Sequence, residues 1–137
     1  KACITGRNDD KVRALAKVSG ATPLTRQEAE SRNFDALVHC TPLGMYPKVD
    51  GCFFEENLPA DIVFDMVYNP IETPLIARAR AEGRVAIPGL EMFLEQAVRQ
   101  FEIWTEEEAP RSSMSNAITN ALEAYNQARE NQARARR

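Results

Sequence analysis

The chain has 137 residues, a length typical of one domain with a core of its own. With 44% hydrophobic and 27% charged residues, its composition excludes a disordered tail, a collagen-like fibre and a disulfide scaffold. A net charge of −3 excludes a strongly basic nucleic-acid binder. The first residue is Lys1 rather than methionine, so we expect the chain to be part of a longer protein.

The strands are expected where short apolar or β-branched runs occur, at residues 2–5, 34–39, 61–65 and 84–87. Helices are expected between them. Asp10 is predicted to cap a helix over 11–18 that stops at Gly20. The run from Thr25 to Glu28 fits a capping box, and Thr73 with Pro74 begins a helix that ends near Glu82.

Two helices are expected in the last third of the chain. The first follows Gly89, and its apolar face carries Leu90, Leu94, Ala97, Phe101 and Trp104. The second starts near Ser112, and its apolar stripe carries Met114, Ile118, Ala121, Leu122 and Tyr125. Its polar, basic end over 129–137 is expected to fray.

Strands that alternate with helices predict a parallel α/β sheet with right-handed crossovers. Ligands bind such sheets beyond the carboxyl ends of the strands, so the loops that follow the strands are the candidate site. These loops comprise residues 6–8, 41–45, 66–69 and 88–89.

Arg7 and Lys11 follow the first predicted strand, where a dinucleotide fold holds the adenosine ribose. Two cations there favour a ribose 2′-phosphate, and hence NADP. Residue type alone favours the alternative, in which they are surface cations paired with Asp9 and Asp10. Tyr68 is either a ligand to a polyhydroxylated or carboxylate group or an ordinary rim tyrosine.

Gln96, two turns into the long helix, is either a ligand or solvent-facing. The turn at Thr41-Pro42-Leu43-Gly44 is rigid, and Gly44 allows close approach of a ligand. His39 is the only histidine and has no Cys or Asp partner at the sequence spacing of a catalytic triad or metal site, which favours a structural role.

The cysteines Cys3, Cys40 and Cys52 form no CxxC pair, so we expect free thiols in a reducing cytoplasm and no metal site. The sequence contains no zinc pattern, P-loop, GxSxG or GxGxxG motif. It also has no apolar run of the roughly 20 residues that a membrane span needs.

In their order and spacing, these loops resemble the C-terminal, NADP-binding domain of shikimate dehydrogenase, from residue 2 to about Met114. The similar segments are Ile4-Thr5-Gly6-Arg7-Asn8, Cys40-Thr41-Pro42-Leu43-Gly44-Met45-Tyr46-Pro47, Asp65-Met66-Val67-Tyr68-Asn69-Pro70 with Thr73-Pro74-Leu75, Gly89-Leu90-Glu91-Met92-Phe93 with Gln96-Ala97, and Gln100-Phe101-Glu102-Ile103-Trp104-Thr105. The Met-Tyr-Pro and Gly-x-Glu-Met-Phe forms look closest to versions fused behind a type I 3-dehydroquinate dehydratase.

The resemblance implies an incomplete doubly wound, Rossmann-like parallel sheet over residues 1–110, followed by a C-terminal helix and basic tail over 111–137. The first strand and the glycine-rich turn are missing from it. In the strand order 3-2-1-4-5-6 the missing strand is central. We therefore expect unpaired edges on strands 2–5 and 36–39 on one side and on 61–65 on the other.

The resemblance also implies the roles of single residues. The adenosine 2′-phosphate is assigned to Arg7, Asn8 and Lys11, the pyrophosphate and ribose path to Thr41, Pro42 and Leu43, the nicotinamide to Met66, Gly89 and Met92, and shikimate to Tyr68 and Gln96. The chain departs from the family pattern in three places, since Gly6 replaces Asn, Asn8 replaces Thr and His39 replaces Asn.

The implied function is that of the NADP-binding portion of shikimate dehydrogenase, which reversibly reduces 3-dehydroshikimate to shikimate with NADPH in aromatic amino-acid (chorismate) biosynthesis. In that family the catalytic Lys and Asp belong to an N-terminal substrate domain, so this chain alone is predicted to be inactive. The expected partners are shikimate or 3-dehydroshikimate and the missing substrate domain, with room for a homo-oligomer. The alternatives are a nucleotide-binding or assembly module without catalysis, and a quinate/shikimate dehydrogenase that uses NAD.

Overall fold

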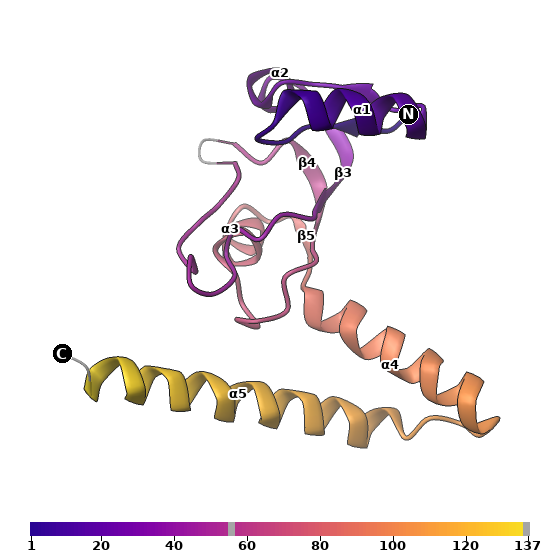
Figure 1. Ribbon diagram of the computed structural model, residues 1–137, viewed down its shortest axis with the longest axis vertical. Helices are drawn as coiled ribbons and strands as arrows, with labels where there is room; N and C mark the ends of the chain where they lie inside the picture. Colours follow the sequence, from indigo (N-terminus) through magenta and orange to yellow (C-terminus); the bar gives the residue numbers. More distant parts are fainter. Residues whose placement is uncertain (55–56, 136–137) are drawn as a thin grey trace.

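The computed structural model describes residues 1–54 and 57–135 (Figure 1). Strands and helices alternate along most of this part of the chain, as predicted, although one strand follows another directly and the last two helices are consecutive. The elements in chain order are β1 (Cys3–Ile4), α1 (Asp9–Ser19), β2 (Thr22–Pro23), α2 (Arg26–Glu30), β3 (Phe34–His39), β4 (Ala60–Asp65), α3 (Pro74–Ala81), β5 (Val85–Ile87), α4 (Gly89–Thr105) and α5 (Arg111–Ala135).

The strands form two separate parallel sheets. One contains β1 and β2, and the other has the order β3-β4-β5. The predicted α/β class and parallel direction are confirmed. The expectation that strand 61–65 has an unpaired edge is wrong, because β4 lies between β3 and β5. β2 was not predicted, since Thr22 and Pro23 are too few to show a strand period.

Local capping chemistry sets the helix ends. The capping box of α2 forms as predicted, with the Glu28 carboxylate accepting hydrogen bonds from the N–H and O–H of Thr25, which lowers the pKa of Glu28. The predicted cap of α3 also forms at Thr73. In α1 the cap is Asn8 rather than Asp10, because the Asn8 side chain accepts from the Lys11 N–H at 3.0 Å.

The main hydrophobic core joins the two sheets. Leu24 follows β2, Ala29 lies in α2, Val63 is the centre of β4, and Leu75 belongs to α3. These residues form one buried cluster with Phe54, Leu58 and Ala79. The segments before and after β3 therefore pack on the same core, which holds the β1–β2 pair beside the larger sheet.

A cavity of about 830 Å³ separates β1 from β3. Within the described residues β1 pairs only with β2, and β3 pairs only with β4, so the facing edges are free. The sequence predicts a central gap, but with strand 61–65 on its far side, whereas the structure has the gap between β1 and β3. The gap explains why Val38 in a predicted buried strand is 54% exposed. Both strands line it, through Cys3, Ile4 and Thr5 on one side and Leu37, Val38 and His39 on the other.

Helices α4 and α5 leave the sheet region and double back beneath it (Figure 1). Arg111 and Glu95 pair across the two helices, and this contact lowers the pKa of the Glu95 carboxyl. The Arg129 guanidinium lies 4.2 Å from the centre of the Tyr46 ring, so α5 contacts the loop after β3. Trp104, predicted on the apolar face, is 75% exposed at the far end of α4.

α5 begins one residue before the predicted start and stays helical to Ala135, so fraying from residue 129 is not seen. Residues 136–137 of the predicted basic tail lie outside the described part. Over the residues that are described, no helix combines the length and apolar character needed to cross a bilayer.

Candidate functional site

His39 and Asp65 are the last residues of two neighbouring strands. The parallel register places them opposite each other at the carboxyl end of the sheet. The imidazole Nδ1 lies 2.9 Å from Asp65 Oδ1, and both side chains are buried. The absence of a suitably spaced Asp in the sequence is therefore misleading, because the register joins residues 26 positions apart.

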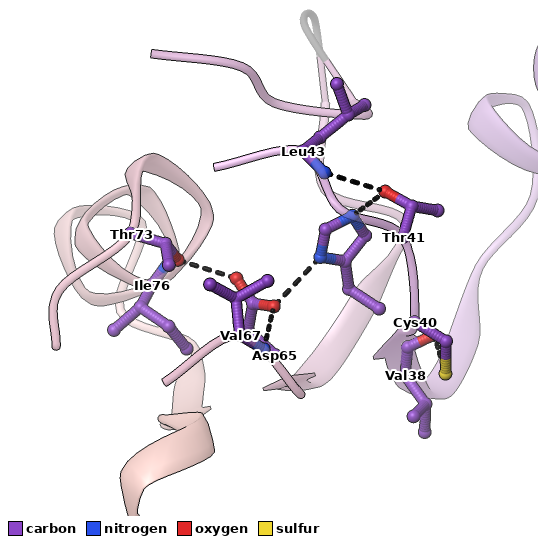
Figure 2. A network of polar contacts seen from close by, with 9 residues as sticks. Val38, Cys40, Thr41, Leu43, Asp65, Val67, Thr73 and Ile76 are labelled. Carbon is purple, nitrogen blue, oxygen red and sulfur yellow. Dashed lines mark hydrogen bonds and ion pairs between the residues drawn. The ribbon is translucent and has the colours of Figure 1, made fainter. Parts of the chain in front are cut away.

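The pair extends into a chain of hydrogen bonds (Figure 2). His39 Nε2 lies 2.5 Å from Thr41 Oγ1, and the Leu43 N–H donates to the same hydroxyl oxygen at 3.3 Å. On the other side, the Thr73 hydroxyl donates to Asp65 Oδ2 at 2.6 Å. The network thus ties the loop after β3 to the start of α3.

The Asp65 carboxylate determines which way the hydrogen bonds point. Asp65 already accepts the Val67 N–H and the Thr73 hydroxyl, so its carboxyl group acts as an acceptor here and Nδ1 of His39 is the donor to it. With the ring in that tautomer, Nε2 accepts from the Thr41 hydroxyl. The predicted structural, hydrogen-bonded role of His39 is confirmed. Sequence reasoning missed Asp65 and Thr73 as its partners, although an acidic residue that ends an apolar strand was the available signal.

Cys40, between His39 and Thr41, is not activated by this network. Burial, and after it the negative charge of Asp65, raises the pKa of the Cys40 thiol. The thiol therefore stays protonated near neutral pH, and its sulfur donates to the Val38 carbonyl at 3.9 Å. All three cysteines are free thiols, as predicted.

The loop after β4 meets the start of α4 at Gly89. A Cβ on Gly89 would lie 2.5 Å from the Val67 carbonyl oxygen, so only glycine permits this approach. The N-cap Pro88 offers no side-chain hydrogen bond to the first turn of α4. The amides of that turn therefore lie beside Met66 and Val67 without a side-chain cap, and Met92 follows half-buried within the same turn.

Tyr68 belongs to the same edge. Its ring stacks on Phe93 of α4, with centres 4.6 Å apart and planes 18° from parallel. Gln96 lies three residues after Phe93, on the same helix face, and is exposed. Met66 and Tyr68 are each 39% exposed. The structure therefore places the predicted nicotinamide residues and Tyr68 around the start of α4, with Gln96 exposed two turns into the same helix.

Arg7, Asn8 and Lys11 lie apart from this group, after β1 in the smaller sheet. Arg7 and Lys11 are exposed. Across the described residues neither forms an ion pair, and Asp10 pairs instead with Arg13 at 2.7 Å. The alternative in which these two cations neutralise Asp9 and Asp10 is therefore not observed. The Asn8 side-chain oxygen is occupied as the cap of α1.

Of the predicted cofactor residues, Thr41 lines the cavity between β1 and β3, and Thr5, two residues before Arg7, lines it from the opposite side. The buried Thr5 hydroxyl has no hydrogen-bond partner in the described part of the chain. Unpaired cations after β1 and a first turn of α4 without a side-chain cap are groups that bind the phosphates of an anionic dinucleotide. Among the residues described, no cluster of three or more His, Cys, Asp or Glu side chains is arranged to hold a metal ion.

Known proteins share this sequence and fold. The family described as Shikimate 5'-dehydrogenase C-terminal domain matches residues 89–119. A shikimate dehydrogenase (NADP(+)) of Oleidesulfovibrio alaskensis is 35% identical over 125 residues, which are 87% of this chain and 44% of that protein. The chain thus spans less than half the length of this curated relative.

Solved structures agree with the sequence comparison. A chorismate mutase/shikimate 5-dehydrogenase fusion protein from Clostridium acetobutylicum superposes with a TM-score of 0.75 at 25% identity, over 88% of this chain and 46% of that one. A quinate dehydrogenase from Corynebacterium glutamicum in complex with NAD gives 0.73 at 30% identity over the same shares. Together with the geometry of the strand ends, these likenesses establish that the chain belongs to the shikimate dehydrogenase family and corresponds to its C-terminal domain.

Proposed function

We propose that the chain is the NADP-binding portion of an NADPH-dependent shikimate dehydrogenase that reversibly reduces 3-dehydroshikimate to shikimate in chorismate biosynthesis. The observation that carries the proposal is the exposed, unpaired cation pair Arg7 and Lys11 at the carboxyl end of β1. A relative 35% identical to this chain is named as an NADP(+) enzyme. NADPH would supply the hydride, and the chain's own residues would hold and orient it.

The cofactor residues divide by the part of the dinucleotide that each would hold. The Arg7 guanidinium would form paired hydrogen bonds with the adenosine 2′-phosphate, and Lys11 would add a point charge. Asn8 would contribute its amide N–H₂, since its oxygen caps α1. Thr41, Pro42 and Leu43 would line the pyrophosphate and ribose, while Met66, Gly89 and Met92 would enclose the nicotinamide.

The substrate would lie on the far side of the nicotinamide, at the edge of α4. The Tyr68 phenol is held by its stacking on Phe93, so it presents its hydroxyl at a defined place. Gln96 offers both a donor and an acceptor one turn along the same helix. These two groups would hydrogen-bond the hydroxyls or the carboxylate of shikimate.

The gap between β1 and β3 would receive the missing first strand of the sheet, which the family resemblance places upstream of this chain together with the N-terminal substrate domain. An inserted strand would satisfy both free edges and cover Val38. Residues 1–110 would then complete the cofactor domain, with 111–137 as its C-terminal helix. A cytoplasmic location, fusion to a type I dehydratase and homo-oligomer formation stay predictions.

The proposal is tested by measuring NADPH oxidation with 3-dehydroshikimate. We expect no turnover from the chain alone, because the resemblance places the catalytic Lys and Asp in the substrate domain. Turnover is expected once that domain and the missing first strand with its glycine-rich turn are supplied, fused or co-expressed. Turnover by the chain alone, or none after the substrate domain is added and NADP binding is verified, would contradict the proposal. NADP binding without turnover in the assembled protein would favour a non-catalytic nucleotide module.

A second candidate is quinate oxidation with NAD. A quinate dehydrogenase that binds NAD is 30% identical to this chain, so the fold admits that reaction. The cations Arg7 and Lys11 favour NADP instead, because NAD carries no 2′-phosphate. Titrating the assembled protein with both cofactors and both substrates separates the two candidates, and a clear preference for NAD with quinate would select the second.

A further inference from the structure

The His39 network lies directly behind the loop over residues 41–43, to which the proposed function assigns the pyrophosphate and ribose. We propose that His39 is a positioning residue, which holds the Thr41 hydroxyl inward and so fixes this loop for the cofactor. The inference rests on the proposed function. His39 itself is 5% exposed, so it acts through Thr41 rather than by touching a ligand.

The position of Thr41 is determined twice. Its hydroxyl oxygen lies 2.5 Å from His39 Nε2, within hydrogen-bond distance, and the same oxygen accepts the Leu43 N–H at 3.3 Å. The second contact closes a local turn over Thr41, Pro42 and Leu43, and the first anchors that turn to the end of β3 (Figure 2). Without the imidazole, the hydroxyl would be free to rotate and the turn would lose its anchor.

The imidazole is held just as firmly on its other side. Asp65 Oδ1 accepts from His39 Nδ1 and from the Val67 N–H, while Oδ2 accepts from the Thr73 hydroxyl. Asp65 and Thr73 are fully buried at the base of the sheet and of α3. The imidazole ring thus links the protein interior to the loop: its Nδ1 contacts Asp65 and its Nε2 contacts Thr41.

Substitutions can remove the hydrogen bond of one imidazole nitrogen while keeping that of the other. An Asn amide nitrogen lies where Nδ1 does, so His39→Asn keeps the bond to Asp65 and loses the one to Thr41. Thr41→Val removes the same contact from the other end at nearly constant shape, and with it the Leu43 N–H bond to the same oxygen. Losing one such hydrogen bond is expected to raise the KM for NADPH about three- to tenfold in the assembled enzyme, with kcat changed less than about twofold.

A double-mutant cycle tests whether the two residues act together. If they do, the variant that combines His39→Asn with Thr41→Val has the KM of Thr41→Val alone, because His39 then has no hydroxyl left to hold. Additive effects on KM, or no effect of His39→Asn, would overturn the inference. A lower kcat with an unchanged KM would also overturn it, because that pattern reports only a smaller folded fraction. Cys40→Ser, whose side chain lies outside the network, is the matched control and should leave KM unchanged.

Amide hydrogen exchange provides a readout that needs no turnover. The Leu43 amide is expected to exchange faster in His39→Asn and Thr41→Val than in the wild type, and to stay protected in Thr41→Ser, which keeps a hydroxyl. Equal Leu43 exchange in the wild type and both variants would refute the positioning role. Because the exchange is measured without substrate, it distinguishes failure of this inference from failure of the proposed function, which would appear as an inactive wild type.

Discussion

At the residue scale, Arg7 and Arg13 carry the same positive charge in different surroundings. Arg13 is neutralised on its own helix by Asp10 at 2.7 Å, whereas Arg7 has no acidic partner among the described residues. A guanidinium left without an internal partner is available to an external anion. The contrast makes Arg13 the natural control for the role proposed for Arg7.

We expect Arg7→Ala to weaken NADP binding to the assembled protein about ten- to a hundredfold, the loss typical of a charge-assisted contact of about 1.5–3 kcal/mol. NAD binding should be nearly unchanged, since NAD carries no 2′-phosphate. Isothermal titration with each cofactor measures both constants, and Arg13→Ala should alter neither. Equal losses for NADP and NAD would reject the role of Arg7.

At the element scale, Thr73 serves two elements with one hydroxyl. It caps α3 by accepting the Ile76 N–H at 3.3 Å, and it donates to Asp65 at the end of β4. Both contacts are buried, unlike the exposed capping box at Thr25. The position of the helix and the position of the carboxylate are therefore linked through a single atom.

We expect Thr73→Val to lower the free energy of unfolding by about 2–4 kcal/mol, which combines a lost helix cap with an unpaired buried carboxylate oxygen. Thr25→Val should cost only about 1 kcal/mol, because its capping box is in contact with water. Urea denaturation of the two variants supplies the comparison. Equal losses would show that the bond from Thr73 to Asp65 adds nothing to stability.

Elements were predictable where their signals are local. The caps at Thr25 and Thr73 were recognised because a cap and its helix are contiguous in sequence. The cap of α1 was misplaced because Asn8, Asp9 and Asp10 are adjacent and each can cap a helix, so only the backbone conformation decides. The position of Asp65 at the end of an apolar strand marked it as a candidate partner, but its pairing with His39 depends on the strand register, which the whole core sets.

At the scale of the whole molecule, the cavity between β1 and β3, here called the cleft, leaves the sheet of the isolated chain incomplete. Val38 lines this cleft and is 54% exposed, whereas Val18 is 87% exposed on α1 and does not line it. A strand inserted in the cleft would cover Val38 and leave Val18 in water. A substitution at Val38 therefore tests strand insertion, and the same substitution at Val18 tests whether an exposed valine outside the cleft can be replaced without effect.

We expect Val38→Asp to leave the folded chain intact, as judged by circular dichroism, yet to reduce the turnover recovered with the substrate domain at least tenfold. The reason is that insertion would bury an unpaired charge, which costs several kcal/mol. Val18→Asp should give full recovery. If Val38→Asp also recovers fully, the cleft is not where the two parts join.

The free edges of two strands, β1 and β3, border the cleft, and this affects how fast an inserted strand dissociates. A strand added to the edge of a sheet is held by one row of backbone hydrogen bonds, and it dissociates once that row is broken. A strand seated between β1 and β3 would be held by two rows, and both must open before it leaves. Once formed, the assembly of this chain with the part that supplies the strand is therefore expected to dissociate slowly. If two samples of assembled protein are mixed, they should exchange these parts much more slowly than the free parts associate.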